Sequence, residues 1–220
     1  MKNFCKIVFI FFFVFNFAYA SETIKIKDIR NNIFVLDIYG NRYLATKDNK
    51  LKSGDFLRSI KKPAILLMDN NKICFSKNSS IKIKSISKSQ KLITVIILKG
   101  KFLFFTNRIS GFKYHLLINS NTIENNSGYI FLSKNSQNSF SLQTFKDYSY
   151  LYTNLSKKIK LNPNSFYDLV SNDKSKNYKH NFKRSDFLHQ CLTHKNIINS
   201  ANEMKYQCSV INSKISCGYK

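Results

Sequence analysis

Acidic residues are scarce in this chain, in which 12 aspartates and glutamates stand against 36 lysines and arginines. Acids spaced so thinly do not supply the paired carboxylates that many hydrolases need, and Asp55 and Asp69 are linked only by proximity in sequence. The chain also lacks a G-x-S-x-G motif, a Walker-type glycine loop and a Rossmann fingerprint. These absences predict no catalytic residues and indicate a protein that is not an enzyme.

Arginine is the second shortage. The chain has five arginines, at Arg30, Arg42, Arg58, Arg108 and Arg184, and its other cations are lysines. Specific recognition of phosphates and bases favours the planar guanidinium, so we expect no specific nucleic-acid partner. The formal net charge of +24 still favours attraction to an anionic envelope polymer. The abundance of Asn, Lys, Ile, Phe and Ser, with 6 Gly, 2 Pro and no Trp, is typical of an AT-rich genome and can account for part of the charge.

Long apolar runs are confined to the N-terminus. An apolar run over residues 7–15 follows two lysines and precedes an A-x-A pattern at residues 18–20. This order is typical of a secretory signal peptide, residues 1–20, cleaved before Ser21. The apolar centre is shorter than the roughly 20 residues of a spanning helix, although an uncleaved anchor remains the alternative. The later run from Leu92 to Phe105 contains Lys99 and Lys101. We expect a periplasmic or secreted protein with no transmembrane span after signal cleavage.

The rest of the chain is built of short apolar pieces separated by polar turns. This texture predicts a mainly β fold of stacked antiparallel sheets, a sandwich or solenoid, over residues 21–155. The clearest predicted strands are Ala64 to Met68, Ile73 to Phe75, Leu92 to Leu98, Phe102 to Phe105, Tyr114 to Ile118, Tyr129 to Leu132 and Phe140 to Thr144.

One stretch carries a recognisable order of residues. A Leu-x-x-Gly-Asp step is followed by a hydrophobic-Arg-Ser step, an apolar strand, an Asp-Asn turn, a second strand and, further on, a strand that passes through a glycine. The residues concerned are Leu51, Gly54, Asp55, Leu57, Arg58, Asp69, Asn70 and Gly100.

This order resembles the FecR domain, a periplasmic β-rich module first known from ferric-citrate signalling. The clear match covers about Ile33 to Phe105 and continues weakly to about Leu151. Two positions depart from the family pattern, because Asn70 replaces a turn glycine and Ser59 replaces a threonine. Asparagine tolerates positive φ better than other residues with a side chain, so the turn is still allowed.

The resemblance implies binding or sensing in the periplasm. In signalling members the domain contacts an outer-membrane transporter and, through a membrane helix and a cytosolic segment, a sigma factor. This sequence begins directly with the predicted signal peptide, so we expect a stand-alone binding module that contacts an envelope protein or an anionic envelope polymer. The alternatives are a cell-envelope hydrolase and a secreted cationic effector that binds anionic surfaces.

The C-terminal part has a different texture. Residues 156–184 are predicted to be a basic linker, and residues 185–220 a disulfide-held appendage. In the appendage, Ser185 is a candidate cap for a helix whose apolar residues recur at helical spacing, with an irregular tail as the alternative. Those apolar residues are Phe187, Leu188, Cys191, Leu192 and Ile198.

A hairpin is predicted at the end of the chain. If Asn212-Ser213 forms a two-residue loop, Ile211 faces Lys214 and Cys208 lies directly opposite Cys217. Signal cleavage leaves four cysteines, and an even number in an exported protein favours bridges. We predict disulfides between Cys208 and Cys217 and between Cys74 and Cys191.

Other candidate site residues have simpler explanations. His180, His189, Cys191 and His194 lack the paired spacing of zinc sites, so we predict no metal and no cofactor. His115, in an apolar strand, is interpreted as a structural sheet residue rather than a general base. Tyr148, Tyr150 and Tyr152 line one face of a strand. An exposed row could stack on sugar rings or a partner, but a core packed with aromatics is the favoured interpretation.

The cysteine prediction can be checked directly. Peptide mapping of the mature protein without reducing agent should recover the peptides of Cys208 and Cys217 joined, and those of Cys74 and Cys191 joined. Four free thiols would contradict both pairings.

Overall fold

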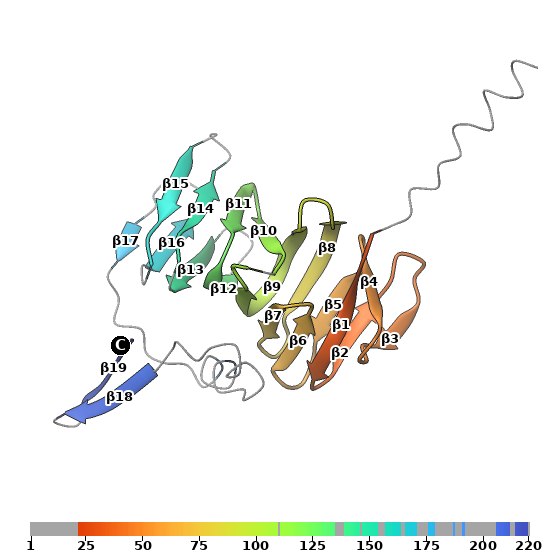
Figure 1. Ribbon diagram of the computed structural model, residues 1–220, viewed down its shortest axis with the longest axis horizontal. Coiled ribbons are helices and arrows are strands. Elements are labelled where there is room, and N and C mark those ends of the chain that lie inside the picture. The colour runs from red at the N-terminus through yellow and green to blue at the C-terminus, as the bar shows by residue number, and fades with distance from the viewer. Residues whose placement is uncertain are drawn as a thin grey trace, which may run out of the picture. The chain divides into compact units, whose positions relative to one another are not determined.

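The computed structural model describes residues 22–109, 111–134, 139–145, 147–153, 157–163, 166–170, 176–178, 187, 191, 206–211 and 214–219 (Figure 1). The chain divides into two units, Met1–Lys179 and His180–Lys220, each taken by itself below. Within the described ranges, no helix has the length and apolar character needed to cross a bilayer. The predicted signal peptide and the histidines His180, His189 and His194 lie outside the described residues.

The first unit contains two β-sheets that share one long strand. In the first sheet, the strands pair in the order β1–β6–β7–β9–β12–β13–β16–β17. Their bounds are β1 Thr23–Arg30, β6 Ala64–Met68, β7 Asn71–Phe75, β9 Leu92–Thr106, β12 Gly128–Lys134, β13 Ser139–Phe145, β16 Phe166–Val170 and β17 Lys176–Tyr178.

In the second sheet, the order is β3–β2–β5–β8–β9–β10–β11–β14–β15. Its remaining strands are β2 Ile33–Leu36, β3 Arg42–Leu44, β5 Phe56–Ser59, β8 Ser80–Ser87, β10 Lys113–Ile118, β11 Asn121–Asn125, β14 Ser149–Tyr152 and β15 Lys158–Leu161. The short β4, Lys50–Lys52, pairs with the start of β1. The pairings are antiparallel except that between β9 and β10.

Strand β9 joins the two sheets. Its first half, Leu92 to Lys99, pairs with β8, and its second half, from Gly100 to Thr106, pairs with β12. Gly100 lies at the change-over with φ of +106°, which a residue with a Cβ adopts only with strain. A Cβ at this position would lie 2.7 Å from the Cα of Ser79. The close approach of β9 to the turn before β8 therefore needs a glycine.

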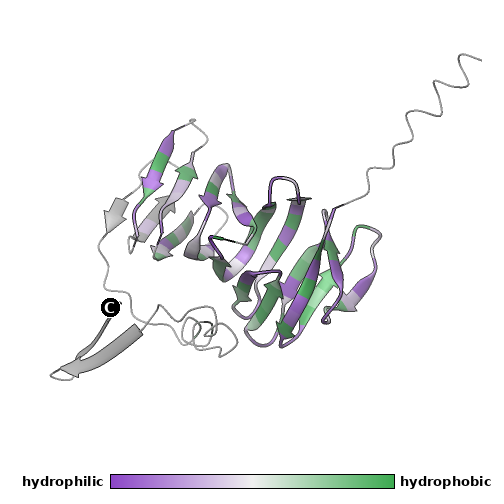
Figure 2. Ribbon diagram, viewed as in Figure 1, coloured by the Kyte–Doolittle hydropathy of each residue, from purple (hydrophilic) through white to green (hydrophobic). Residues whose placement is uncertain are grey.

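The core lies between the two sheets. Apolar residues alternate with polar ones along most strands, as the banded colouring in Figure 2 shows, and the inward set forms one buried cluster. The ring centroids of Phe104, from the first sheet, and Tyr114, from the second, are 5.2 Å apart. The amide of Asn125 on β11 also donates to the hydroxyl of Thr106 on β9, at 3.2 Å. These contacts connect the layers and confirm the predicted mainly β fold.

The β domain extends past the predicted boundary at residue 155. Strand β15 pairs with β14, and β16 pairs with β13, so much of the predicted basic linker belongs to the sheets. The physical reason is alternation: Lys158-Ile159-Lys160-Leu161 places Leu161 in the core and both lysines in solvent. The charged lysines led to the prediction of a linker where the chain forms a half-buried strand.

The second unit contains the predicted hairpin. Strands β18, Tyr206–Ile211, and β19, Lys214–Tyr219, are antiparallel with Ile211 opposite Lys214. Cys208 lies directly opposite Cys217, so the predicted register is confirmed, and the disulfide between them stays a prediction. In the appendage before the hairpin, the structure describes Phe187 and Cys191, which are buried and helical.

The predicted bridge from Cys74 to Cys191 would join the two units, and it stays a prediction. Cys74 carries a free thiol in the middle of β7, with no exposed surface. Its cross-strand neighbours are Ile65 on β6 and Leu103 on β9, so it fills space as a small apolar residue. An even number of cysteines in the sequence does not reveal that one of them packs in this way.

The role of Gly100 can be measured with a matched glycine. Gly100→Ala should lower the free energy of unfolding by about 2–5 kcal/mol, since a left-handed alanine and an overpacked site each add a cost. Gly40 is the control, because its φ is +86° but a Cβ there would meet nothing within 4 Å. Gly40→Ala should cost only about 1–2 kcal/mol in the same urea titration. Equal losses in the two variants would contradict the packing argument.

Candidate functional site

A row of tyrosines lies on the outer face of the second sheet. Strand β14 places Ser149 and Leu151 in the interior, so the alternate residues Tyr150 and Tyr152 face outward and are half-buried. Tyr148, immediately before the strand, is 51% exposed. The favoured interpretation of these three tyrosines as core residues is therefore wrong, because the serine and leucine between them occupy the inward positions.

Two lysines of the edge strand β15 cover the tyrosine rings. Tyr150 is paired with Lys160 and Tyr152 with Lys158 in the register of the two strands. The Nζ atom of Lys158 is 4.2 Å from the ring centroid of Tyr150 and 5.4 Å from that of Tyr152. Nζ of Lys160 is 3.7 Å from the ring centroid of Tyr148. These distances are those of cation–π contacts. We call these five residues the tyrosine–lysine row.

Glu124 on β11 fixes one end of the row. Its carboxylate accepts a hydrogen bond from the hydroxyl of Tyr152 at 2.8 Å and another from the amide of Asn126 at 2.9 Å. Burial acts to raise the pKa of Glu124, but these two hydrogen bonds and the fields of His115 and Lys113 outweigh it and lower the pKa below 4.5. The carboxylate is thus ionised at neutral pH and holds the Tyr152 ring in place.

Lys158 is held in its charged form. Hydrogen bonding with Tyr152 raises the pKa of Lys158, and the fields of Tyr152, Tyr150 and Glu124 add to the effect, although desolvation opposes it. Lys158 and Lys160 are both exposed. The row therefore offers aromatic surface and two ammonium groups to solvent on one strand pair.

The surrounding surface is also cationic. Lys82 and Lys84 on β8 and Lys113 on β10 are exposed on the same outer face. Among the described outward-facing residues of β8, β10, β11, β14 and β15, Glu124 is the single acid. An anion that approaches this face meets several lysines and one acid, which already accepts two hydrogen bonds.

The Gly-Asp step found in the sequence has a structural role. Gly54, with φ of +97°, donates its N–H to the carbonyl of Ile83 at 2.7 Å, and the carbonyl of Asp55 accepts the N–H of Ile83 at 2.8 Å. The Asp55 carboxylate accepts the N–H of Lys52 at 2.8 Å. Burial, with the field of Asp37, raises the pKa of Asp55 despite that hydrogen bond and the charge of Lys52. The step joins the turn before β5 to β8.

The other motif residues also build the scaffold. Leu51 and Leu57 are fully buried in the core, whereas Arg58 is exposed on the outer face of β5. The residue with positive φ in the β6–β7 turn is Asp69, at +48°. Asn70, which stands where the family pattern has a glycine, does not have a positive φ.

Ser59 links two turns through its hydroxyl. Its hydroxyl donates to the carbonyl of Ser76 and accepts the N–H of Ser79 at 3.2 Å. The hydroxyl of Ser79 in turn accepts the N–H of Lys101 at 3.2 Å. These bonds connect the end of β5 to the residue after Gly100, so a serine fills the place of the family's threonine.

The predicted absence of a metal site stays a prediction for the whole chain. Among the residues that the structure describes, no group of three or more His, Cys, Asp and Glu could hold a metal ion. His115 is half-buried on the outer face of β10, opposite Glu124 on β11. Strand β11 separates it from the tyrosine–lysine row.

Comparisons with known proteins give little more. No protein-family model matches the chain, and no curated protein does. Among solved structures, the chain is similar to the crystal structure of a proposed anti-sigma factor from Parabacteroides distasonis ATCC 8503, with 10% sequence identity and a TM-score of 0.46. The match covers 56% of this chain and 59% of that chain. At this level of similarity, only the surface of the molecule can indicate its function.

The opposite pKa shifts of Glu124 and Asp55 can be tested with the same kind of substitution. Because the folded-state pKa of Glu124 is lower than 4.5, the ionised side chain stabilises the fold above pH 4.5. This stabilisation is lost as the pH falls through the folded-state pKa. The stability difference between wild type and Glu124→Gln should therefore shrink in acid.

For Asp55, the raised pKa means that wild type should lose stability relative to Asp55→Asn as the pH rises above 3.8. Urea titrations between pH 3 and pH 7 measure both differences. Parallel pH dependence in the two pairs would contradict the assignment.

Proposed function

We propose that this protein is an exported, non-enzymatic binding module whose tyrosine–lysine row holds an acidic glycan of the cell envelope. The observation that carries the proposal is the position of Lys158 and Lys160 over the rings of Tyr148, Tyr150 and Tyr152 on an outward sheet face. The export compartment rests on the N-terminal signal pattern. The FecR resemblance supports a binding or sensing role in the periplasm.

The spacing of the row suits a linear polymer. Alternate residues of a strand are about 6.8 Å apart, so the three tyrosines and the two lysines repeat at this interval along neighbouring strands. Tyr148 and Tyr150 each offer ring surface and a hydroxyl to a sugar, whereas Tyr152, whose hydroxyl donates to Glu124, offers ring surface. Each lysine offers a point charge to a carboxylate or phosphate substituent. The row can thus contact several consecutive units of one chain.

The row has the composition of a glycan site more than of a nucleic-acid site. Specific phosphate and base contacts use bidentate arginine, and the cations of the row are lysines. A cationic effector that binds any anionic surface is the second candidate, and the net charge of +24 favours it. The two candidates differ in whether the five residues of the row matter more than other exposed lysines.

Binding to a defined acidic polymer tests the proposal. The probe is polygalacturonate, with neutral dextran as its uncharged counterpart, in isothermal titration calorimetry at moderate ionic strength. Lys158→Gln/Lys160→Gln should weaken binding about tenfold, which corresponds to about 1.4 kcal/mol. Tyr150→Ala/Tyr152→Ala should weaken it comparably while net charge is unchanged.

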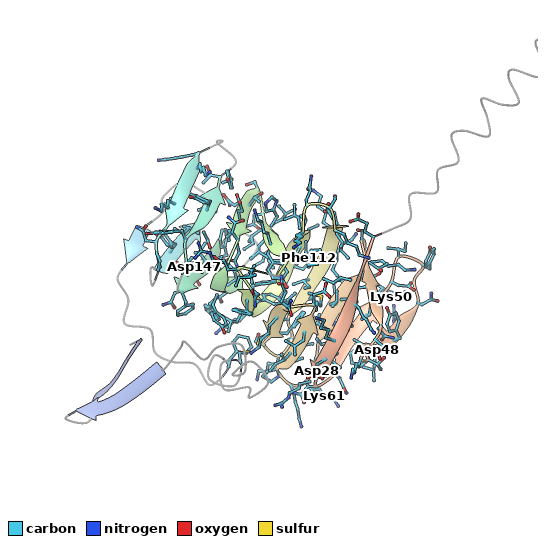
Figure 3. All side chains as sticks on the ribbon, in the orientation of Figure 1. Asp28, Asp48, Lys50, Lys61, Phe112 and Asp147 are labelled. Carbon is cyan, nitrogen blue, oxygen red and sulfur yellow. The ribbon has the colours of Figure 1, made fainter. Side chains whose placement is uncertain are left out.

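The matched control is Lys61→Gln/Lys62→Gln, which removes the same charge from an exposed turn. Figure 3 labels Lys61 at the lower edge of the strand unit and Asp147, the neighbour of Tyr148, well apart from it on the left. This variant should bind like wild type. Equal weakening by both lysine pairs would favour the non-specific effector, and dextran binding as tight as polygalacturonate binding would contradict the role of charge.

A further inference from the structure

The second sheet has an open edge at β3, the opposite end of the sheet from β15. β3 pairs with β2, and no strand in the described part of the chain is registered on its other side. The backbone N–H of Ala45 donates to the carbonyl of Ile33, and the backbone N–H of Asp37 donates to the carbonyl of Asn41. Since hydrogen-bonded pairs alternate in antiparallel strands, the N–H and C=O groups of Arg42 and Leu44 point away from β2.

Exposed apolar side chains gather at this edge. Phe34 and Leu44 are cross-strand neighbours on β2 and β3, and they are 39% and 44% exposed. Ile38 and Tyr39, in the turn between the strands, are 49% and 73% exposed. We call these four residues the edge patch. Clustered apolar surface beside unpaired strand groups is typical of a site for another strand.

The edge patch is held in a defined shape. The carboxylate of Asp37 accepts hydrogen bonds from the N–H of Tyr39 at 2.9 Å, and from the N–H and side-chain amide of Asn41 at 2.8 Å each. Ile38 lies so close to Gly54 that a Cβ on the glycine would overlap its Cγ2 atom. The Gly-Asp step therefore seats the turn that carries the patch.

The charges around the edge patch are positive. Arg42 is exposed on β3, and Arg58 is exposed on β5 directly across from Phe34. Nζ of Lys52 lies 5.6 Å from the ring centroid of Tyr39. The neighbouring acids have partners already, because Asp37 bonds within its turn and Asp48 pairs with Lys25 at 2.8 Å. An incoming segment with carboxylates would be complementary.

We propose that β3 accepts an extended segment of a partner protein that carries apolar and acidic side chains in turn at every second position, on one face of its strand. The segment would pair with the outward N–H and C=O groups of Arg42 and Leu44. On the outer face that these two residues share, it would place an apolar side chain beside Leu44 and a carboxylate, two residues along, beside Arg42. A second copy of this chain is a poorer occupant, because it brings like charge to a protein of net charge +24. The site is separate from the tyrosine–lysine row.

A synthetic peptide of repeating Val-Thr-Glu-Thr units, which has valine and glutamate on one face of a strand, is labelled with a fluorophore and serves as the probe in fluorescence anisotropy with the mature chain. We expect saturable binding that weakens at least about tenfold when lysine replaces glutamate, or when every second peptide nitrogen is methylated. Leu44→Pro should weaken binding similarly, since it removes an outward N–H and leaves the bonds to β2 intact. Arg42→Glu provides a second variant if the proline unfolds the edge.

The controls separate this site from others. Lys113→Glu reverses an exposed charge on β10, which β2, β5, β8 and β9 separate from β3, and should leave binding within about twofold of wild type. Lys158→Gln/Lys160→Gln should also leave it unchanged, so failure here is distinct from failure of the glycan site. Equal binding of the lysine peptide, or equal loss in Arg42→Glu and Lys113→Glu, would overturn the proposal. A dimer seen by sedimentation that Leu44→Pro dissolves would assign the edge to a second copy.

Discussion

The passage of β9 from one sheet to the other is the constraint on which the first unit depends. The change-over at Gly100 brings the backbone against Ser79, so that the same strand can pair with β8 before it and with β12 after it. Phe102 and Phe104 then enter the core from one layer, and the ring of Phe104 meets that of Tyr114 from the other. With the layers joined in this way, burial of the inward residues leaves the alternate residues of the second sheet for solvent and for partners.

The second sheet carries different chemistry at its two ends. At β14 and β15, tyrosine rings lie beneath lysine side chains, and a carboxylate orients the outermost hydroxyl. At β2 and β3, exposed apolar groups adjoin unpaired backbone and arginines. The first end has the properties of a surface for a charged polymer and the second those of a surface for a peptide strand. One scaffold can therefore present two independent contacts.

Much of the scaffold could be predicted because its strands alternate or stand between clear turns. The pairing of Cys208 with Cys217 in register followed from counting across a two-residue loop. The failures have physical causes. Lys158 to Leu161 was concealed by charge, and the inward side of β14 could not be chosen between Tyr150 and Leu151 without knowing its neighbours. The row itself depends on contacts between β14 and β15, which no local pattern encodes. Spacing by two identified the tyrosines but not their lysine partners.

The central claim is that the outward face at β14 and β15 is the contact surface for an acidic glycan. The most direct measurement is a titration of ¹⁵N-labelled protein with polygalacturonate, followed by amide chemical shifts. The account predicts that saturable shifts concentrate on β14, β15 and the adjoining part of β11, and leave β1 and β6 unchanged. Shifts of similar size at exposed lysines throughout the strand unit, including Lys61, would contradict it.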